Sequence, residues 1–332
     1  MKLVQVVLVF SSLGYLHGIS VEQEAFDDWK QKFDKSYKST DAEEKAFEIF
    51  THNFNELREH NENFKKGLVS YTLGLWEESD KLASIVSSSL NRIKVPVVKG
   101  RSRVLPSAVP KSSIKSLNYV ELGWVNEVDR QKKCGSCYTF SACGVIEGQI
   151  FKKTGELLSL SKQQLLDCVR DGRNQGCKGG IVSDVFEYIK WNGITTNKIY
   201  PYRANDTFPC SYNTSTAVTK IKVHVWPQGI DETYIKNLLI NVGPLVVTID
   251  ASHQSFILYK SGVYSEYSCT SNVNHAMLLV GFDTDSQFGD YWLIKNSFGK
   301  NWGENGYLRL KRGVNMCGVS SYITYALIWR IS

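Results

Sequence analysis

The first 133 residues of this 332-residue chain contain no cysteine, whereas eight cysteines follow between Cys134 and Cys317. Beyond the first residues, no run is apolar enough to cross a membrane. Neither sign of charge dominates, because 39 Lys and Arg face 33 Asp and Glu, and the basic residues are not gathered as a nucleic-acid surface requires. The sequence therefore predicts an ordinary globular protein, with no membrane span and no nucleic-acid partner.

A short apolar run opens the chain. Lys2 is followed by apolar sequence from Leu3 to Leu13, and polar, charged sequence begins at Glu22. Because the run is too short to span a bilayer, it predicts a signal peptide over residues 1–18. We therefore expect the secretory pathway, ending in the lysosome or outside the cell, and we interpret the cysteines as disulfide partners first.

The remainder divides into three parts by composition. Apolar residues recur at helical spacing over residues 21–66, whereas residues 84–113 are rich in serine, then basic and interrupted by proline. All the cysteines come later. This order predicts a helical prodomain with an exposed linker at residues 19–113, joined to a catalytic domain at residues 114–332.

Within the catalytic domain, predicted helices precede predicted strands. Helices are expected over 137–152, after a capping box at Ser161, over the apolar stripe 181–189, and from Asp231 to Leu239. Beyond Pro244 the strand-like segments are LVVTID, HAMLLVGF, YWLIKN, GYLRLK and ITYALI. This order indicates an α+β fold in two lobes, and a cleft between lobes is a common ligand site.

The segment Cys134-Gly-Ser-Cys137-Tyr138 carries the strongest chemical signal. Cys137 would begin a helix, whose N-terminus favours a thiolate. A redox pair, half of a zinc site and a plain disulfide are the alternatives. The redox reading lacks a flanking βαβ pattern, and the zinc reading lacks a second C-x-x-C or paired histidines.

Two further segments decide among these alternatives. His275 lies 138 residues after Cys137 in VNHAMLLVGF, and Asn296 follows 21 residues later in WLIKNSFGKNWGENGY. A Cys, His and Asn in this order and spacing are typical of papain-like enzymes. From about residue 25 to the C-terminus the sequence resembles the papain-like cysteine protease family, in its cathepsin L-like branch.

The resemblance implies a fold and a reaction. It implies a two-lobed papain-like fold, with a helical lobe and an antiparallel β-barrel-like lobe, that acts as a cysteine endopeptidase without cofactor or metal. Cys137 would attack the scissile carbonyl, and His275 would move the proton. Asn296 would orient the imidazole, and Gln131 would stabilise the oxyanion together with the Cys137 backbone N–H.

The resemblance also implies how substrate binds. The Gly179–Gly180 main chain would pair with the substrate backbone, and a hydrophobic P2 side chain is expected. The remaining binding residues that it implies are Ile181, Val182, Thr248, Asn274, Ala276, Phe298 and Tyr322.

Further expectations concern covalent structure and partners. The family pattern pairs Cys134 with Cys177, Cys168 with Cys210, and Cys269 with Cys317, which leaves Cys137 and Cys143 free. Two sequons predict glycosylation at Asn205 and Asn213. The expected partners are protein or peptide substrates and the chain's own propeptide, which acts as an intramolecular inhibitor of a monomer. The alternative is a catalytically weak homologue that acts by binding, because Tyr138 and Phe298 stand where tryptophan is usual.

Overall fold

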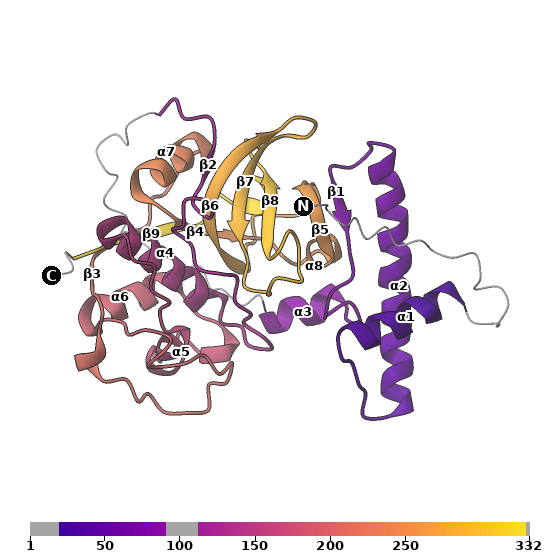
Figure 1. Ribbon diagram of the computed structural model, residues 1–332, viewed down its shortest axis with the longest axis horizontal. Helices are drawn as coiled ribbons and strands as arrows, with labels where there is room; N and C mark the ends of the chain where they lie inside the picture. The colour runs from indigo at the N-terminus through magenta and orange to yellow at the C-terminus, as the bar shows by residue number, and fades with distance from the viewer. Residues whose placement is uncertain (1–19, 91–111, 330–332) are drawn as a thin grey trace, which may run out of the picture.

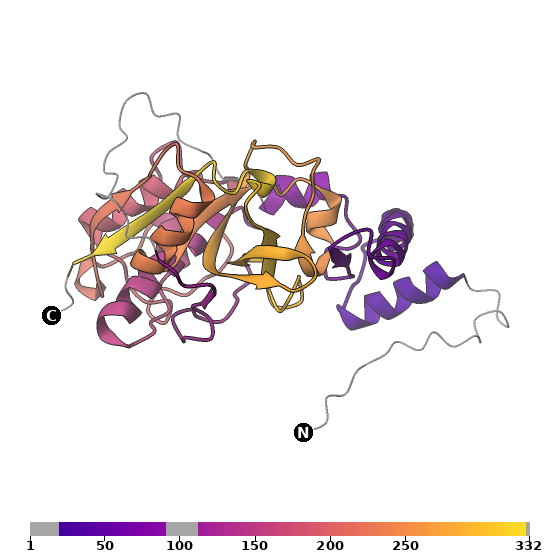
Figure 2. The same ribbon diagram turned by 90° about the horizontal axis from the view of Figure 1, so that it is seen from above.

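A computed structural model of the chain describes residues 20–90 and 112–329. We call the first range the N-terminal block and the second the C-terminal block. They lie side by side in two perpendicular views, with the N-terminal block at the right (Figures 1 and 2). The predicted signal peptide and most of the predicted linker lie outside the described residues.

Two helices make up most of the N-terminal block. They are α1 (Val21–Lys32) and α2 (Thr40–Lys65), and the side chains of Ser20 and Ser39 cap their N-termini. The predicted helical region 21–66 is therefore right except for the break between the two helices. Their contact buries a cluster of apolar residues, namely Phe26, Trp29, Ala46, Phe50 and Phe54.

A strand and a third helix lead from this pair to the C-terminal block. The strand is β1 (Tyr71–Leu73), and the helix is α3 (Ala83–Leu90). The prediction that an exposed linker begins at residue 84 is wrong for this stretch. Ala83 and Val86 are buried, and the Ala83 backbone N–H donates to Gln254 Oε1 of the C-terminal block at 2.6 Å. Tertiary packing thus overrides a serine-rich composition that favours a coil.

Except for the last and shortest one, which was not predicted, the helices of the C-terminal block agree with the sequence expectations. They are α4 (Cys137–Thr154), α5 (Lys162–Cys168), α6 (Val182–Asn192), α7 (Glu232–Val242) and α8 (Gln254–Ile257). The predicted capping box before α5 forms by half. The Ser161 side chain accepts from the Gln164 backbone N–H, but the Gln164 side chain bonds to Gly193 and Thr195 instead of returning to the cap.

One sheet joins both blocks. Its strands in the C-terminal block are β2 (Leu117–Asn118), β3 (Ile221–Val225), β4 (Leu245–Ile249), β5 (Tyr259–Tyr264), β6 (His275–Asp285), β7 (Gly289–Lys295), β8 (Tyr307–Lys311) and β9 (Ile323–Ile328). Their order is β1-β5-β8-β7-β6-β4-β9-β3, and β2 pairs with β6. Strands β5 and β8 are parallel, so the expectation of a purely antiparallel lobe is corrected to a mixed sheet.

Helix α4 packs closely on this sheet. At Gly144 an added Cβ would lie 2.6 Å from Leu278 Cδ2 of β6, so only glycine allows this approach. The contact fixes α4, which begins at Cys137, against β6, which begins at His275. Two residues 138 positions apart thereby belong to one packed unit of helix and strand.

Three disulfides close the C-terminal block. They join Cys134 to Cys177, Cys168 to Cys210, and Cys269 to Cys317, as the resemblance implies. Cys137 and Cys143 are both buried and belong to no disulfide. Within residues 20–90 and 112–329, no helix combines the length and the apolar character that crossing a bilayer requires.

Candidate active site

Cys137 is the first residue of α4, and its side chain is fully buried. The first turn of a helix has free N–H groups that attract negative charge, which is the setting of a reactive thiolate. Cys143 lies further along the same helix, where burial raises the pKa of its thiol. Of the two cysteines outside disulfides, only Cys137 therefore has surroundings that favour ionisation.

His275 and Asn296 form a hydrogen-bonded pair. The first begins β6, the second directly follows β7, and these two strands are paired. Asn296 Oδ1 lies 2.8 Å from His275 Nε2, so the ring must carry its proton on Nε2 to donate to that oxygen. The other ring nitrogen, Nδ1, is buried with no hydrogen-bond partner among the described residues. It is the atom that remains to take a proton.

Burial governs the charge of this imidazole. Burial lowers the pKa of His275 to about 4, although the bond to Asn296 acts in the opposite direction. The Phe298 ring lies over the imidazole, with ring centroids 4.9 Å apart, and Phe256 meets it edge-on at 6.1 Å. An aromatic wall thus keeps water from the His275–Asn296 bond in this structure.

Gln131 is held beside the same pair. Its backbone N–H donates to Ser297 O at 2.8 Å, and its side-chain Oε1 accepts from Ser297 Oγ. Its Nε2 donates to Cys134 O at 2.7 Å. One side-chain amide therefore links the loop before Cys137 to the residue after Asn296, and the structure brings all four predicted catalytic residues into one region.

The glycine segment is tied to the loop that precedes Cys137. The Cys134–Cys177 disulfide joins the two, and the Gly135 backbone N–H donates to Cys177 O at 2.9 Å. Gly179 has a φ of +103°, which side chains rarely adopt. An added Cβ at Gly180 would lie 2.2 Å from Asn174 Oδ1. Both positions thus require glycine for local backbone and packing reasons.

The residues predicted to line the P2 pocket fall into two groups. Thr248 lies opposite Ala276 across β4 and β6, and its hydroxyl donates to Tyr322 O at 3.2 Å. Asn274, one residue before His275, accepts from the Ala251 backbone N–H through Oδ1. Ile181 and Val182 lie at the start of α6, where the next residue, Ser183, adjoins the Tyr322 hydroxyl. All of these predicted pocket residues but Asn274 are buried in this structure.

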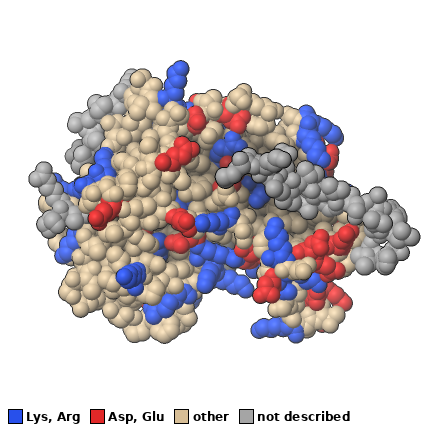
Figure 3. All heavy atoms as spheres, in the orientation of Figure 1, with Lys and Arg blue, Asp and Glu red and all other residues tan. Residues whose placement is uncertain are grey.

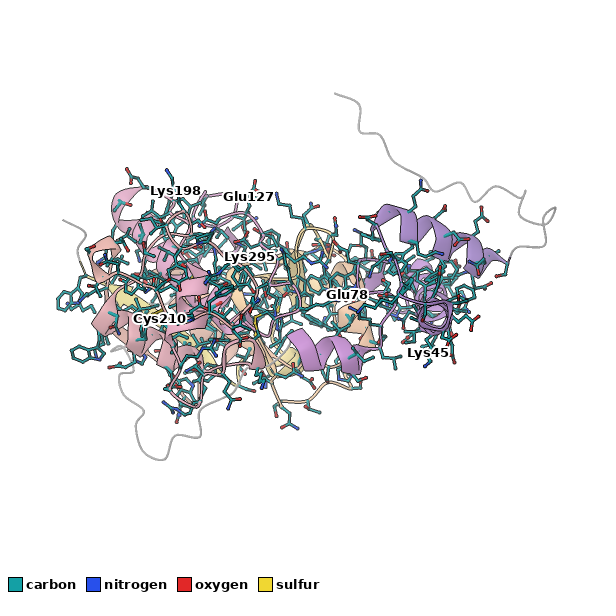
Figure 4. The ribbon with its side chains drawn as sticks, turned by 90° about the horizontal axis from the view of Figure 1, so that it is seen from below. Lys45, Glu78, Glu127, Lys198, Cys210 and Lys295 are labelled. Atoms are coloured by element: carbon teal, nitrogen blue, oxygen red, sulfur yellow. A yellow bond between two sulfur atoms is a disulfide. The ribbon has the colours of Figure 1, made fainter. Side chains whose placement is uncertain are left out.

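A cluster of charged residues lines a pocket together with Ala276 and Asn296, and of these charged residues Glu147 and Lys162 are buried whereas Asp129 is exposed. Lys162 is 3.1 Å from Asp129 and 3.4 Å from Glu147. Lys295 donates to the backbone carbonyls of Asn126 and Glu127, and burial lowers its pKa to about 8. Figure 4 labels Lys295 and Glu127 in this region. Because Asn296 follows Lys295 directly, these bonds hold the orienting amide in place.

The N-terminal block covers the site. Strand β1 pairs with β5, and the Trp76 ring stacks on Phe298 with centroids 5.6 Å apart and planes 6° apart. Within that block, Asn53 donates to Ser79 O, and Asn61 forms two hydrogen bonds with the Leu73 backbone. These two asparagines of α2 hold the covering segment on that helix.

Sequence reasoning missed the docking contacts. Arg130 lies 3.1 Å from Glu77 and 3.3 Å from Glu78, yet nothing in its sequence surroundings marks it. In the sequence, Trp76 and Glu78 are apparent only as departures from a propeptide motif of the resembled family, and Glu77 lies between them. Their partners are far away in the sequence, so only the fold could have paired them.

Comparison with known proteins gives two matches to family models. Residues 115–327 match the papain family of cysteine proteases, and residues 26–82 match the cathepsin propeptide inhibitor domain. Mouse cathepsin S is 38% identical over 305 residues, which are 90% of this chain and 89% of that protein. Cathepsin L of Sarcophaga peregrina is 38% identical over 317 residues, 92% of this chain and 93% of that protein.

Solved structures agree over the same span. The digestive procathepsin L 3 of Tenebrio molitor larval midgut has a TM-score of 0.84 and 33% identity, covering 93% of this chain and 100% of that one. A recombinant stem bromelain precursor has a TM-score of 0.80 and 31% identity, covering 93% of this chain and 99% of that one. Both are precursor forms, so the similarity includes the N-terminal block.

Proposed function

The chain belongs to the papain family of cysteine proteases and is a zymogen with a propeptide inhibitor domain, and from that premise we propose that Cys137, His275 and Asn296 hydrolyse peptide bonds through an acyl-enzyme. The observation that carries this proposal is the 2.8 Å bond between His275 Nε2 and Asn296 Oδ1, which leaves Nδ1 with no partner among the described residues. This arrangement supports proton transfer at Nδ1.

The first half of the reaction forms the acyl-enzyme. His275 Nδ1 takes the thiol proton of Cys137, and the thiolate attacks the scissile carbonyl carbon. Negative charge then develops on the carbonyl oxygen. Gln131 Nε2 and the Cys137 backbone N–H are the proposed donors to it. The C–N bond breaks as the imidazolium gives its proton to the leaving amine, and a thioester to Cys137 remains.

The second half releases the acid. His275 removes a proton from water, and the hydroxide attacks the thioester carbonyl. The C–S bond then breaks, which frees the new carboxyl group and returns the thiol–imidazole pair. Asn296 keeps the ring in one orientation during both halves, and Phe298 limits the competition of water for their hydrogen bond.

Substrate binding follows from the residues around the site. We propose that the substrate backbone pairs with Gly179 and Gly180. A hydrophobic P2 side chain would then enter between Ile181 and Val182 on one side and Thr248, Ala276 and Tyr322 on the other, with Asn274 and Phe298 at its margins. Because Trp76 stacks on Phe298 next to His275, we propose that substrate entry requires removal of the N-terminal block.

Maturation and location complete the proposal. We propose a signal peptide at residues 1–18, a propeptide at 19–113 and a mature domain from residue 114, with cleavage within residues 100–118. The oxidising pathway fits three disulfides and exposed asparagines at both sequons. The chain is expected in the lysosome or outside the cell, as a glycosylated monomer.

Labelling of the nucleophile tests the proposal. Acid-activated protein is treated with an epoxide or vinyl-sulfone peptide probe and then mapped by mass spectrometry. We expect one adduct on Cys137, none on Cys143, and loss of peptidase activity in proportion to the adduct. Cys137→Ala should abolish hydrolysis, whereas Cys143→Ala should keep it. A correctly folded, processed enzyme that takes no probe would support a homologue that acts by binding.

A further inference from the structure

A small surface of the C-terminal block holds the segment of the N-terminal block that crosses the active site. We call it the acceptor surface and define it as Arg130, Phe298 and Asn301. Arg130 and Phe298 are paired by an antiparallel β-bridge. A Cβ added at Gly299 would lie 3.5 Å from Arg130 Cβ, an ordinary van der Waals contact, so the two residues are neighbours. The surface is therefore assembled from the residue before Gln131 and from the loop after β7.

Three residues of the N-terminal block fill the acceptor surface. Trp76 stacks on Phe298, and Glu77 Oε1 accepts from Arg130 Nη1 at 3.1 Å and from Asn301 Nδ2 at 2.8 Å. Glu78 Oε1 accepts from Arg130 Nη2 at 3.3 Å. In Figure 4, Glu78 lies where the two blocks meet, whereas Lys45 lies at the far end of the N-terminal block. The occupant is thus an aromatic residue followed by two acidic residues.

Among the described residues, Arg130 has no ion pair within its own block, and both of its ion pairs are with the N-terminal block. The adjacent Asp129 pairs with Lys162, and Lys300 of the same loop pairs with Glu127. When the N-terminal block leaves, Arg130 loses both its carboxylate partners and keeps its charge.

The acceptor surface lies on the leaving-group side of the cleaved bond. The Phe298 ring lies 4.9 Å from the His275 ring, centroid to centroid. In the proposed reaction His275 protonates the leaving amine. The peptide that follows that amine therefore departs next to Phe298, and its next residues come within reach of the Arg130 guanidinium.

We propose that Arg130 makes the activated protease select acidic residues on the leaving-group side of the cleaved bond, with Asn301 as its assisting donor. The inference rests on the proposed function. Glu77 and Glu78 then act as an internal copy of the preferred substrate chemistry. A guanidinium can hold a carboxylate by two parallel hydrogen bonds, so both charge and geometry favour glutamate over lysine.

Matched substrates test this selectivity on the activated enzyme. Three quenched fluorogenic peptides differ only in the two residues after the cleaved bond, which are Glu-Glu, Gln-Gln or Lys-Lys. A fourth substrate carries aminocoumarin directly after the cleaved bond and has no such residues. For the wild type, kcat/KM should be about tenfold higher for Glu-Glu than for Lys-Lys. The expected ratio is modest because a partly exposed ion pair adds little free energy at each change, from Lys-Lys to Gln-Gln and from Gln-Gln to Glu-Glu.

Variants identify the source of the preference. Arg130→Gln should remove the Glu-Glu preference and Arg130→Glu should invert it, with each ratio taken within one enzyme. Asn301→Asp, an exposed substitution, should lower the same ratio, and Lys300→Gln is the matched control that should keep it. Equal rates in the wild type, or a preference that survives Arg130→Gln, would overturn the inference. Hydrolysis of none of the four substrates would overturn the proposed function and the inference together.

Discussion

The two blocks of this molecule are stabilised in different ways. The N-terminal block, residues 20–90, has 15 acidic and 9 basic residues and no cysteine. The C-terminal block, residues 112–329, has 18 acidic and 22 basic residues and three disulfides. Figure 3 shows acidic side chains gathered over the N-terminal block at the right. The blocks therefore carry opposite net charge, and only one is closed covalently.

This difference is consistent with an inhibitory block that is removed from an enzyme that stays folded. Phe26, Trp29, Phe50 and Phe54 form a core that is separate from that of the C-terminal block. The contact between blocks is made by the short pairing of β1 with β5, by the Trp76–Phe298 stack and by a few polar groups. It also includes buried residues of the N-terminal block that join the apolar core of the C-terminal block, namely Tyr71, Leu73, Trp76, Ala83 and Val86. The inhibitor can thus leave as a unit while the disulfides keep the enzyme folded.

Replacement of Phe50 should have the largest effect on the difference in stability between the two blocks. This ring is fully buried and lies 5.1 Å from Phe26 and 5.2 Å from Trp29, centroid to centroid. Phe50→Ala should lower the stability of the N-terminal block by about 3–5 kcal/mol and abolish inhibition. The measurement is hydrogen exchange of the inactive Cys137→Ala zymogen at increasing temperature, which reports the opening of each block separately.

Leu68 supplies the control for Phe50, because its side chain is 70% exposed. Leu68→Ala should change neither block measurably. If Phe50→Ala instead lowered the protection of both blocks equally, they would share one cooperative core, and the comparison would be wrong.

Acid should separate the blocks through the buried His275. Burial lowers the pKa of His275 to about 4 from 6.5, and burial also lowers the pKa of His60, whose ring contacts Tyr71 of β1. His60 and Tyr71 leave together, but removal of Trp76 from Phe298 uncovers the His275 ring, which then regains water and binds protons more readily. Release is therefore favoured as the pH falls from 6.5 towards 4 and unaffected above 6.5.

The size of the pH effect on release follows from the shift in the pKa of His275. This shift alone raises the equilibrium constant for dissociation of the N-terminal block by about two orders of magnitude between pH 6.5 and 4. Hydrogen exchange of the β1 amides in the Cys137→Ala zymogen, followed against pH, is the measurement. His275→Gln in that background should flatten most of the pH dependence. An unchanged profile would assign acid release to the carboxylates instead.

The contact between β1 and β5 depends on a single glycine, Gly262. An added Cβ at Gly262, where φ is +93°, would lie 2.5 Å from Ser70 O and 2.7 Å from Tyr71 Cα. Gly262→Ala should therefore weaken the docking of β1 by about tenfold or more. Gly289→Ala is the matched control, since φ there is +82° but no atom lies within 4 Å. Equal effects of both variants on zymogen activation would mean that backbone strain, not the β1 contact, is responsible.

The sequence predicted the chemistry of this molecule better than its inhibition. Cys137, His275 and Asn296 lie in segments whose order and spacing carry information, and the long helices and late strands follow simple periodicity. Strand β1 and helix α3 were missed, because their short or serine-rich segments take form through contacts between blocks. Strands β2, β3 and β5 and helix α8 of the C-terminal block were also missed. Arg130 was missed because its partners, Glu77 and Glu78, are more than fifty residues away.

The smallest expected effect concerns the aromatic ring over the catalytic pair. Phe298 contacts both His275 and Trp76, so it serves the enzyme and the inhibitor at once. Phe298→Ala should lower turnover of the activated enzyme by about tenfold, and by more than its loss of stability explains, because water then competes for the His275–Asn296 bond. Phe298→Trp keeps an aromatic face and should leave turnover unchanged or slightly raised. The measurement is the rate on one fluorogenic peptide, normalised by active-site titration. A wild type without a titratable thiol that gains none from Phe298→Trp would mean that Cys137 is not an activated nucleophile. The acceptor surface would then serve binding alone.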